Sequence, residues 1–354
     1  VHPSYAGNGG SGLVVIAYDN GLSIDSGSAQ VTLSGDVTKL SNLDITSSYD
    51  GSTISGIVSG LTPITYTGPT AGELIVSADN TFTGNVNVIS GALSITHNNA
   101  LGTTAGTTTV ASGAALHLSN NITVAEAITI GGTGISTNGA IRNVADSNTL
   151  SGLITLAADA EIQIDTGTTL ALNVASGNAI TGTFNLTMDS VGTSSIADPI
   201  ATSTGNLTKT GAGTLTLSGT NTYTGDTTIS AGTLTVTGTL ADTTDVSVAS
   251  GATYDVDQTD TIQSLSGAGT INIASTNTLT FGDANDKTID GVIEGDGSII
   301  KLGASTYTLS NTNTYTGDTT ISAGTLKLTG NLNSATNLVI APSATLDLQA
   351  ALTA

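Results

Sequence analysis

The sequence contains no cysteine and no tryptophan, and only three of its 354 residues are phenylalanine. Without cysteine there is no disulfide frame, no thiolate metal site and no thiol nucleophile. A thick globular core in a chain of this length normally contains more aromatic side chains, because each of them buries a large apolar area. The composition therefore favours a thin, elongated core built from Val, Ile, Leu and Ala.

Positive charge is also scarce, since six Lys and Arg stand against 27 Asp and Glu and give a formal net charge of -21. The six basic residues are well separated along the chain: Lys39, Arg142, Lys209, Lys287, Lys301 and Lys327. Nucleic-acid binding needs clustered Lys and Arg, so no nucleic acid is expected as a partner. An anionic membrane surface is disfavoured for the same reason.

Long apolar runs are missing as well. The longest is only the length of a strand and consists of Leu13, Val14, Val15, Ile16, Ala17 and Tyr18. A membrane-spanning helix needs roughly 18–20 apolar residues, so we predict no membrane span in this chain. The chain starts at Val1 with neither an initiator Met nor a charged-then-apolar leader, which indicates a processed or excised chain.

What the sequence does contain is repetition. The segment NTYTGDTTISAGTL at residues 221–234 recurs unchanged at 313–326, and a divergent copy begins with NTFTG at 80–84. The similarity extends into the flanking sequence and defines repeat regions near residues 72–118, 205–256 and 299–348. Repeats of this length indicate an architecture of stacked units. The repeat positions expected to be structural are Tyr223, Gly225, Ile229, Gly232 and Leu234, with Tyr315, Gly317, Ile321, Gly324 and Leu326 in the second copy.

Within the repeats, apolar and polar residues alternate with a period of two, which predicts short β-strands. The alternation places six apolar side chains on one face and threonines on the other: Leu215, Leu217, Leu234, Val236, Ile271 and Ile273. Clusters of Gly, Asn, Asp and Ser separate these runs, and such residues tolerate the backbone angles of turns. No stretch has a helical period, so the predicted fold class is all-β.

Two all-β architectures fit this pattern, an antiparallel sandwich and a β-solenoid. The solenoid is favoured because the strands are short, the inward residues are small aliphatics, and Thr or Ser alternates outward. We expect coils of about 20–25 residues stacked ~4.8 Å apart over residues 66–354. Residues 1–65 lack the repeat and are predicted to be an N-terminal cap or assembly segment, with the apolar strand at 13–18 as its inserted element.

The stretch GNLTKTGAGTLTLSG at residues 205–219, which runs into NTYTGDTTISAGTL, resembles the autotransporter-associated β-helix repeat. This repeat belongs to passenger regions of type V secreted proteins and to very large bacterial surface proteins. The resemblance covers about residues 66–354 and implies a right-handed parallel β-helix at the cell surface or in the extracellular medium. It implies no activity, since such passengers include adhesins, enzymes and plain stalks.

Candidate sites for chemistry are few, and no cofactor is predicted. Calcium is the one metal ion that the sequence could bind. The weak candidate ligands are Asp255 and Asp257 in YDVDQTD and Asp283 and Asp286 in FGDANDKTID. A solvated acidic face is the favoured interpretation of both stretches, because neither has the spacing of a known calcium loop. His117 alternates with leucines and is expected to be a solvated surface histidine.

Catalysis is not expected. The only arginine, Arg142, has just Asp146 near it in the sequence, and the serines lack a matching His and Asp set. The repeated aromatics Phe82, Tyr223 and Tyr315 could form a surface on which glycans stack, but a structural role at corners of the fold is favoured because they recur with the repeat.

The leading hypothesis is an extracellular structural solenoid: a surface stalk, or a matrix or filament subunit that polymerises head to tail through residues 13–18. In that case the partner is a second copy of the chain. The alternative is an adhesin that binds a surface glycan or a cell-surface protein. A β-helix polysaccharide lyase or hydrolase ranks last.

Overall fold

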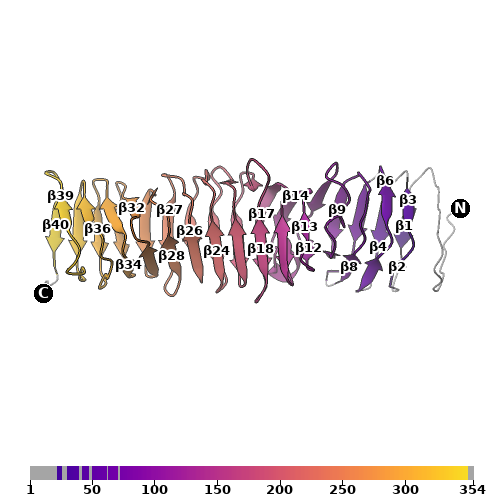
Figure 1. Ribbon diagram of the computed structural model, residues 1–354, viewed down its shortest axis with the longest axis horizontal. Coiled ribbons are helices and arrows are strands. Elements are labelled where there is room, and N and C mark those ends of the chain that lie inside the picture. Colours follow the sequence, from indigo (N-terminus) through magenta and orange to yellow (C-terminus); the bar gives the residue numbers. More distant parts are fainter. Residues whose placement is uncertain are drawn as a thin grey trace.

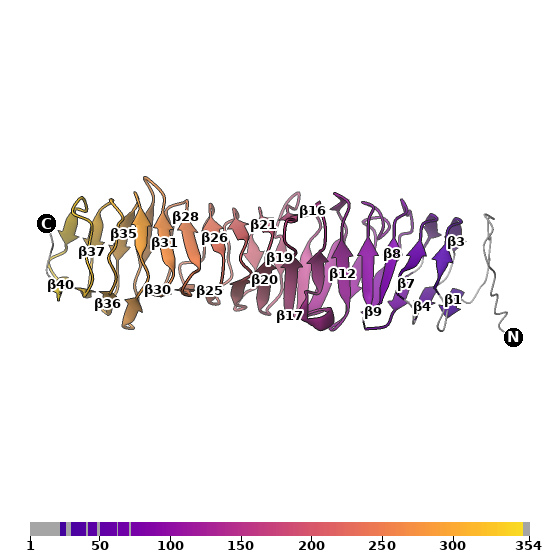
Figure 2. The same ribbon diagram turned by 90° about the horizontal axis from the view of Figure 1, so that it is seen from below.

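The computed structural model describes residues 22–25, 30–39, 42–47, 50–61, 63–70 and 72–349. These residues wind into a long, narrow rod of about 15 turns (Figure 1). The view at right angles shows the same narrow shape (Figure 2). The sequence colours change steadily along the rod in both views, so neighbours in space are neighbouring coils of the chain.

Each coil has up to three strands, and every strand pairs in parallel with strands on the same side of the neighbouring coils. We name the three sides of the rod the first, second and third side, in the order in which the chain visits them.

The first side is formed by β1 (Leu22–Asp25), β4 (Leu43–Thr46), β7 (Ile64–Thr67), β9 (Val86–Ser90), β11 (Thr107–Val110), β14 (Ala127–Gly132), the N-terminal part of β17 (Ile154–Ile164), β19 (Ile180–Thr181), β22 (Ile200–Ala201), β29 (Asp260–Thr261), β32 (Thr278–Phe281), β35 (Ser298–Lys301), β37 (Thr319–Ile321) and β39 (Leu338–Ile340).

The second side is formed by β2 (Thr32–Leu33), β5 (Ser52–Ile54), β8 (Glu73–Val76), β10 (Ala92–Ile95), β12 (Ala115–Leu118), β15 (Ile141–Asn143), the C-terminal part of β17, β20 (Leu186–Ser190), β23 (Leu207–Thr210), β25 (Thr227–Ile229), β27 (Asp245–Val248), β30 (Ser264–Gly267), β33 (Lys287–Ile289), β36 (Thr306–Leu309), β38 (Thr325–Leu328) and β40 (Thr345–Leu348).

The third side is formed by β3 (Val37–Lys39), β6 (Val58–Gly60), β13 (Thr123–Val124), β16 (Ser147–Leu150), β18 (Thr169–Leu172), β21 (Thr193–Ile196), β24 (Thr214–Leu217), β26 (Thr233–Val236), β28 (Thr253–Val256), β31 (Thr270–Ile273) and β34 (Ile293–Gly295). One short 3-10 helix, η1 (Ile135–Thr137), lies between β14 and β15, and the described residues contain no α-helix. No helix in this part of the chain is long and apolar enough to cross a membrane.

The core is a single column of apolar side chains along the rod axis. Leu215 pairs with Leu234, which in turn pairs with Tyr254 on the next coil, and all three side chains are buried. The other inward residues predicted from the alternation are buried as well. Full burial of one such side chain contributes about 1.5–3 kcal/mol, and every coil adds several of them. The prediction of an all-β parallel solenoid is confirmed.

The coil length varies within narrow limits. Thr227 pairs with Val246 on the next coil, a separation of 19 residues, whereas Ile154 pairs with Ile180, a separation of 26. Tight corners require glycine at particular positions. Gly232 has a φ of +65°, and a Cβ atom there would lie 2.3 Å from the carbonyl oxygen of Gly213 on the preceding coil.

A buried asparagine marks each copy of the repeat and connects three successive coils. In one copy, the backbone N–H of Ile200 donates to Asn221 Oδ1 at 3.0 Å, and Asn221 Nδ2 donates to the carbonyl of Thr239 at 2.9 Å. Asn313 and Asn80 make the equivalent bonds in the other two copies. The side-chain oxygen therefore satisfies a buried backbone N–H that would otherwise lack a partner, which explains the invariant first letter of NTYTG.

The two identical segments occupy different sides of the rod. In the copy at 221–234, β25 continues the second side, because Thr227 pairs with Leu207 of β23. In the copy at 313–326, β37 continues the first side, because Thr319 pairs with Ile299 of β35. The same fourteen residues are therefore shifted by one side of the rod, and the repeat does not by itself determine the side on which a residue lies.

The repeated aromatic side chains are buried in the core. Tyr223 has no exposed surface, and its hydroxyl is 2.7 Å from Oγ1 of the inward Thr227. Tyr315 and Thr319 form the same pair. In the divergent copy Phe82 replaces the tyrosine, and the residue four positions later is Val86, so both hydroxyls are absent together. The aromatics therefore have a structural role and cannot form a glycan-stacking surface.

The described residues before position 66 continue the same solenoid. Strands β1 and β4 pair with each other, and β4 pairs with β7, so the coils extend toward the N-terminus beyond the predicted boundary. The predicted assembly strand at 13–18 lies outside the described residues. Its role stays a prediction.

The paired hydroxyls predict a strong thermodynamic coupling between positions 223 and 227. We expect Tyr223→Phe to lower the free energy of unfolding by about 1–3 kcal/mol, because the hydroxyl of Thr227 is left buried without its partner. Adding Thr227→Val recreates the Phe82–Val86 pair and should recover most of that loss. Urea unfolding of the four proteins of the cycle measures the coupling.

The control is Thr228→Val, which changes the outward neighbour of Thr227. Its effect should add to that of Tyr223→Phe without coupling. Additive effects of Tyr223→Phe and Thr227→Val would contradict the prediction.

Candidate functional site

The acidic candidates on the third side belong to a hydrogen-bonded row between coils. Asp255 points outward from β28, where Thr235 Oγ1 donates to Asp255 Oδ2 at 3.2 Å and Asn272 Nδ2 donates to Asp255 Oδ1 at 2.6 Å. Asp257 is exposed, and partial desolvation and the Asp255 carboxylate raise its pKa. The structure therefore places both residues on the outer surface, as the alternation predicts.

The second pair of acidic candidates stabilises turns. Asp283 accepts hydrogen bonds from the backbone and the side chain of Asn285, and these bonds hold its pKa below the usual value, although partial burial acts in the opposite direction. Asp286 accepts a bond from the backbone N–H of Thr306 on the next coil. Within the described part of the chain, no three side chains of His, Cys, Asp or Glu gather into a group that could hold a metal ion.

Charged side chains gather on the outer surface of the second side, over β8 to β20. His117 Nδ1 lies 2.9 Å from Glu73 Oε1, and this bond holds the pKa of Glu73 below its usual value. Arg142 forms a bidentate pair with Asp165, at 3.0 Å and 2.9 Å. The acidic partner of Arg142 is therefore a residue on the next coil and not its sequence neighbour Asp146.

Farther along the same side, Glu161 has no basic partner among its described bonds. Burial, together with the nearby Asp189 carboxylate, raises the pKa of Glu161 to about 7. The row from Glu73 to Asp189 thus combines salt bridges with a carboxyl group that titrates near neutral pH. These residues come from different coils, so their proximity is not visible in the sequence.

Two basic residues, Lys209 and Lys301, are buried inside the rod. Lys209 Nζ donates to four backbone carbonyls, those of Ser190, Thr210, Gly211 and Ala231, at 2.6–3.4 Å. Burial lowers the pKa of Lys209 to about 8, although Asp189 acts in the opposite direction.

Lys301 occupies the same position in the third repeat, twelve residues before the buried Asn313 as Lys209 is before Asn221. Its Nζ donates to the carbonyls of Gly303, Ser305 and Ala323. Burial lowers the pKa of Lys301 as well. The two ammonium groups hold the carbonyls of adjacent coils together at a corner.

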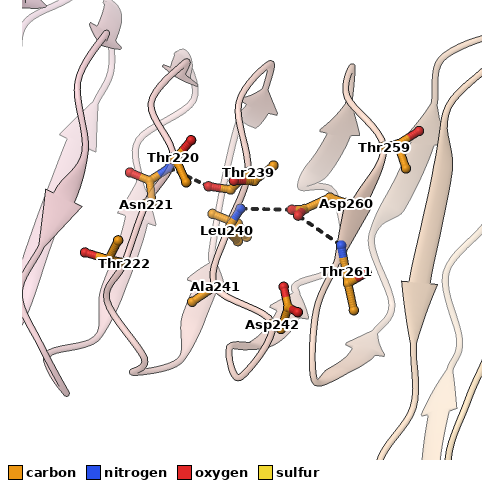
Figure 3. A pocket seen from close by; sticks show the side chains of 10 residues that line it. All are labelled: Thr220, Asn221, Thr222, Thr239, Leu240, Ala241, Asp242, Thr259, Asp260 and Thr261. Atoms are coloured by element: carbon orange, nitrogen blue, oxygen red, sulfur yellow. Dashed lines mark hydrogen bonds between the residues drawn. The ribbon is translucent and has the colours of Figure 1, made fainter.

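An open groove of about 490 Å³ lies on the first side (Figure 3). Ten residues from three successive coils line it: Thr220, Asn221, Thr222, Thr239, Leu240, Ala241, Asp242, Thr259, Asp260 and Thr261. The first side contains little strand here, because between β22 and β32 it has only β29 and an isolated bridge between Thr220 and Thr239.

The floor of the groove contains a buried carboxylate. Asp260 Oδ2 accepts a bond from the backbone N–H of Leu240 and Oδ1 accepts one from Thr261, both at 2.9 Å. Burial raises the pKa of Asp260 to about 6, the exposed Asp242 adds to this effect, and the two backbone bonds oppose it. Each carboxylate oxygen keeps a lone pair that these bonds do not use.

A family model described as Passenger-associated-transport-repeat matches residues 71–95, 207–236 and 299–328. Three segments of the chain are thus similar to this repeat. Each match overlaps one of the predicted repeat regions, so the predicted resemblance to autotransporter passengers is confirmed. In the second and third copies, the matched residues include strands that pair with each other across adjacent coils, β23 with β25 and β35 with β37.

A curated relative carries the same kind of sequence. The adhesin BmaC autotransporter of Brucella suis biovar 1 (strain 1330) is 33% identical over 134 residues, which are 35% of this chain and 4% of the adhesin. The chain thus matches only a small part of that relative's length. No solved structure matches the chain.

The buried ammonium group of Lys209 predicts a specific dependence of stability on pH. Because the pKa is about 8 in the folded state and 10.5 ordinarily, the unfolded chain binds more protons between these values, and the free energy of unfolding should rise with pH. We expect wild type to gain up to about 1.4 kcal/mol per pH unit over Lys209→Met between pH 8 and 10.

Denaturant unfolding at several pH values measures this difference. Ile229→Met is the matched control, because Ile229 pairs with Lys209 on the next coil and has no titratable group. The free energy of unfolding of Ile229→Met should change with pH in the same way as that of wild type. If the free energy of unfolding of Lys209→Met also changes with pH as that of wild type does, the folded state does not perturb the pKa of Lys209.

Proposed function

We propose that this chain is a structural rod of a protein displayed on the bacterial surface or released from it. The observation that carries the proposal is the unbroken pairing of coils along the second side, from β2 to β40. At ~4.8 Å per coil, about 15 turns span about 70 Å. The passenger-associated transport repeats support an extracellular location.

The side chains support a structural function over a catalytic one. Lys209 and Asp260, two of the charged groups with large pKa shifts, are engaged in bonds between coils or at corners. Arg142, the only arginine, is paired with Asp165 through Nε and one terminal nitrogen. Length, rigidity and repetition are the properties that the described residues provide.

Adhesion is the second candidate function, and the relative named as an adhesin favours it. In this case the rod also presents a surface that binds a glycan or a protein on another cell. Beads coated with the purified chain should stay on a cell layer after washing in greater number than beads coated with albumin. Equal retention would remove this candidate.

The rod function predicts that coils can be removed in register without loss of the fold. Thr227 pairs with Val246 and Val246 pairs with Leu265, so deletion of residues 227–264 puts Leu265 in the place of Thr227. We expect a folded rod about 10 Å shorter, because two coils of ~4.8 Å are lost. Circular dichroism and the maximum dimension from small-angle scattering measure the outcome.

The control deletion, residues 227–263, is one residue shorter. It shifts the register by one position, so inward side chains would point outward and the fold should be lost. If both deletions fold equally well, or neither folds, the rod is not built from interchangeable coils.

A finer version of the structural proposal is end-to-end polymerisation of the chain. On the chain's own edge, we propose that β39 takes part, whose Leu338, Val339 and Ile340 are between 38% and 51% exposed. An apolar strand at residues 13–18 of a second copy is the partner that we propose for β39.

Electron microscopy of the purified chain tests polymerisation. Filaments are expected for the full chain and should be absent after deletion of residues 1–20. Replacement of Val339 by Lys, which adds charge to the receiving strand, should also abolish them. Filaments that persist in both variants, or no filaments from the full chain, would reject this proposal.

A further inference from the structure

The groove on the first side arises from the way in which the repeat completes a coil. A coil that contains NTYTG has strands on two of its sides. The asparagine segment occupies the remaining side without forming a strand. For the copy at 221–234 that side is the first side. The two following coils have only the segments at 239–241 and 259–261 there, so the depression extends over three coils.

The lining of the groove combines threonine hydroxyls and two carboxylates with the apolar side chains of Leu240 and Ala241, and it lacks positive charge. Thr220, Thr222 and Thr259 are exposed, and Asp242 is exposed beside them. The hydroxyls recur at the coil spacing, so they present alternating donors and acceptors along the rod axis. The ten lining residues include two carboxylates and no basic side chain.

These features favour one class of ligand over the others. A protein partner would normally bury an aromatic-rich centre, and the lining offers no aromatic side chain. A polyanion would face Asp242 and Asp260 without a compensating cation. A polyhydroxylated chain without negative charge can exchange hydrogen bonds with the threonines and donate to the two carboxylates.

We propose that this groove binds a polysaccharide chain of neutral or amino sugars, laid along the rod axis. The proposal rests on the adhesion function above and names its class of ligand and its site. Because the groove is shallow and has no aromatic platform, a single site should bind weakly, with a Kd near ~1 mM. Many rods displayed together would strengthen attachment through multivalency.

The chain itself supplies a matched control for this proposal. Residues 312–318 repeat the sequence of residues 220–226, and Thr312 and Thr314 are exposed like Thr220 and Thr222. They belong to the copy that lies on different sides of the rod, and they do not line the groove. The same two substitutions can therefore be made inside and outside the groove in an identical local sequence.

The experiment is isothermal titration of the full chain with three tetrasaccharides in the same linkage, of glucosamine, glucose and mannuronate. The glucosamine tetramer should bind most tightly, the glucose tetramer more weakly, and the anionic mannuronate tetramer not measurably. Replacing Thr220 and Thr222 by Val should weaken binding of the first two roughly tenfold. The matched Thr312 and Thr314 pair should leave the Kd unchanged.

Asp242→Asn tests the carboxylate separately. It should reduce the preference for glucosamine over glucose by about tenfold, because the charge–charge attraction is lost while the hydroxyl contacts remain. Denaturation curves of all variants confirm that the substitutions leave the fold intact.

Equal weakening by the two threonine pairs, tight binding of the mannuronate tetramer, or no binding of any tetramer at millimolar concentration would overturn the proposal. Failure here is distinguishable from failure of adhesion, because coated beads could still stay on a cell layer through another surface. The bead assay with the variant that carries Val at positions 220 and 222 connects the titration to adhesion. If these beads are retained as well as beads coated with wild type, the groove is not the surface that mediates adhesion.

Discussion

The structure depends on one constraint: the backbone N–H and C=O groups of every coil must be bonded by the coils on either side. Parallel strands meet this requirement on the flat sides, but corners and strandless segments need side chains to do it. The buried Asn221 and the ammonium group of Lys209 both serve this purpose, although one is neutral and the other charged. Polar residues inside the rod are thus as structural as its leucines.

The placement of the repeat separates sequence identity from spatial equivalence. The two identical segments differ in the side they occupy, and they therefore have different neighbours along the rod. Thr220 borders a groove, whereas Thr312 does not, although both precede the same residues. In a three-sided solenoid, two identical repeats can therefore build their coils in the same way and still contribute to different outer surfaces of the rod.

The sequence predicts much of the fold and little of the site. Period-two alternation identifies inward residues such as Leu215 and Leu234, and the same rule, applied to Lys209, would have placed it inside. A lysine is normally expected to be exposed, and Lys209 is buried only because backbone carbonyls surround its ammonium group. The groove and the Arg142–Asp165 pair depend on residues from adjacent coils, and the coil length varies too much for sequence spacing alone to align them.

The narrow range of coil lengths bears on how such a chain can fold. Paired residues on neighbouring coils lie 17 to 28 positions apart, wherever they lie in the sequence. The entropy lost in closing each coil depends on that separation and not on the length of the whole chain. One coil can form on the edge left by the previous one, so folding can proceed from one end. Chain entropy therefore sets no upper limit on the length of a protein built in this way.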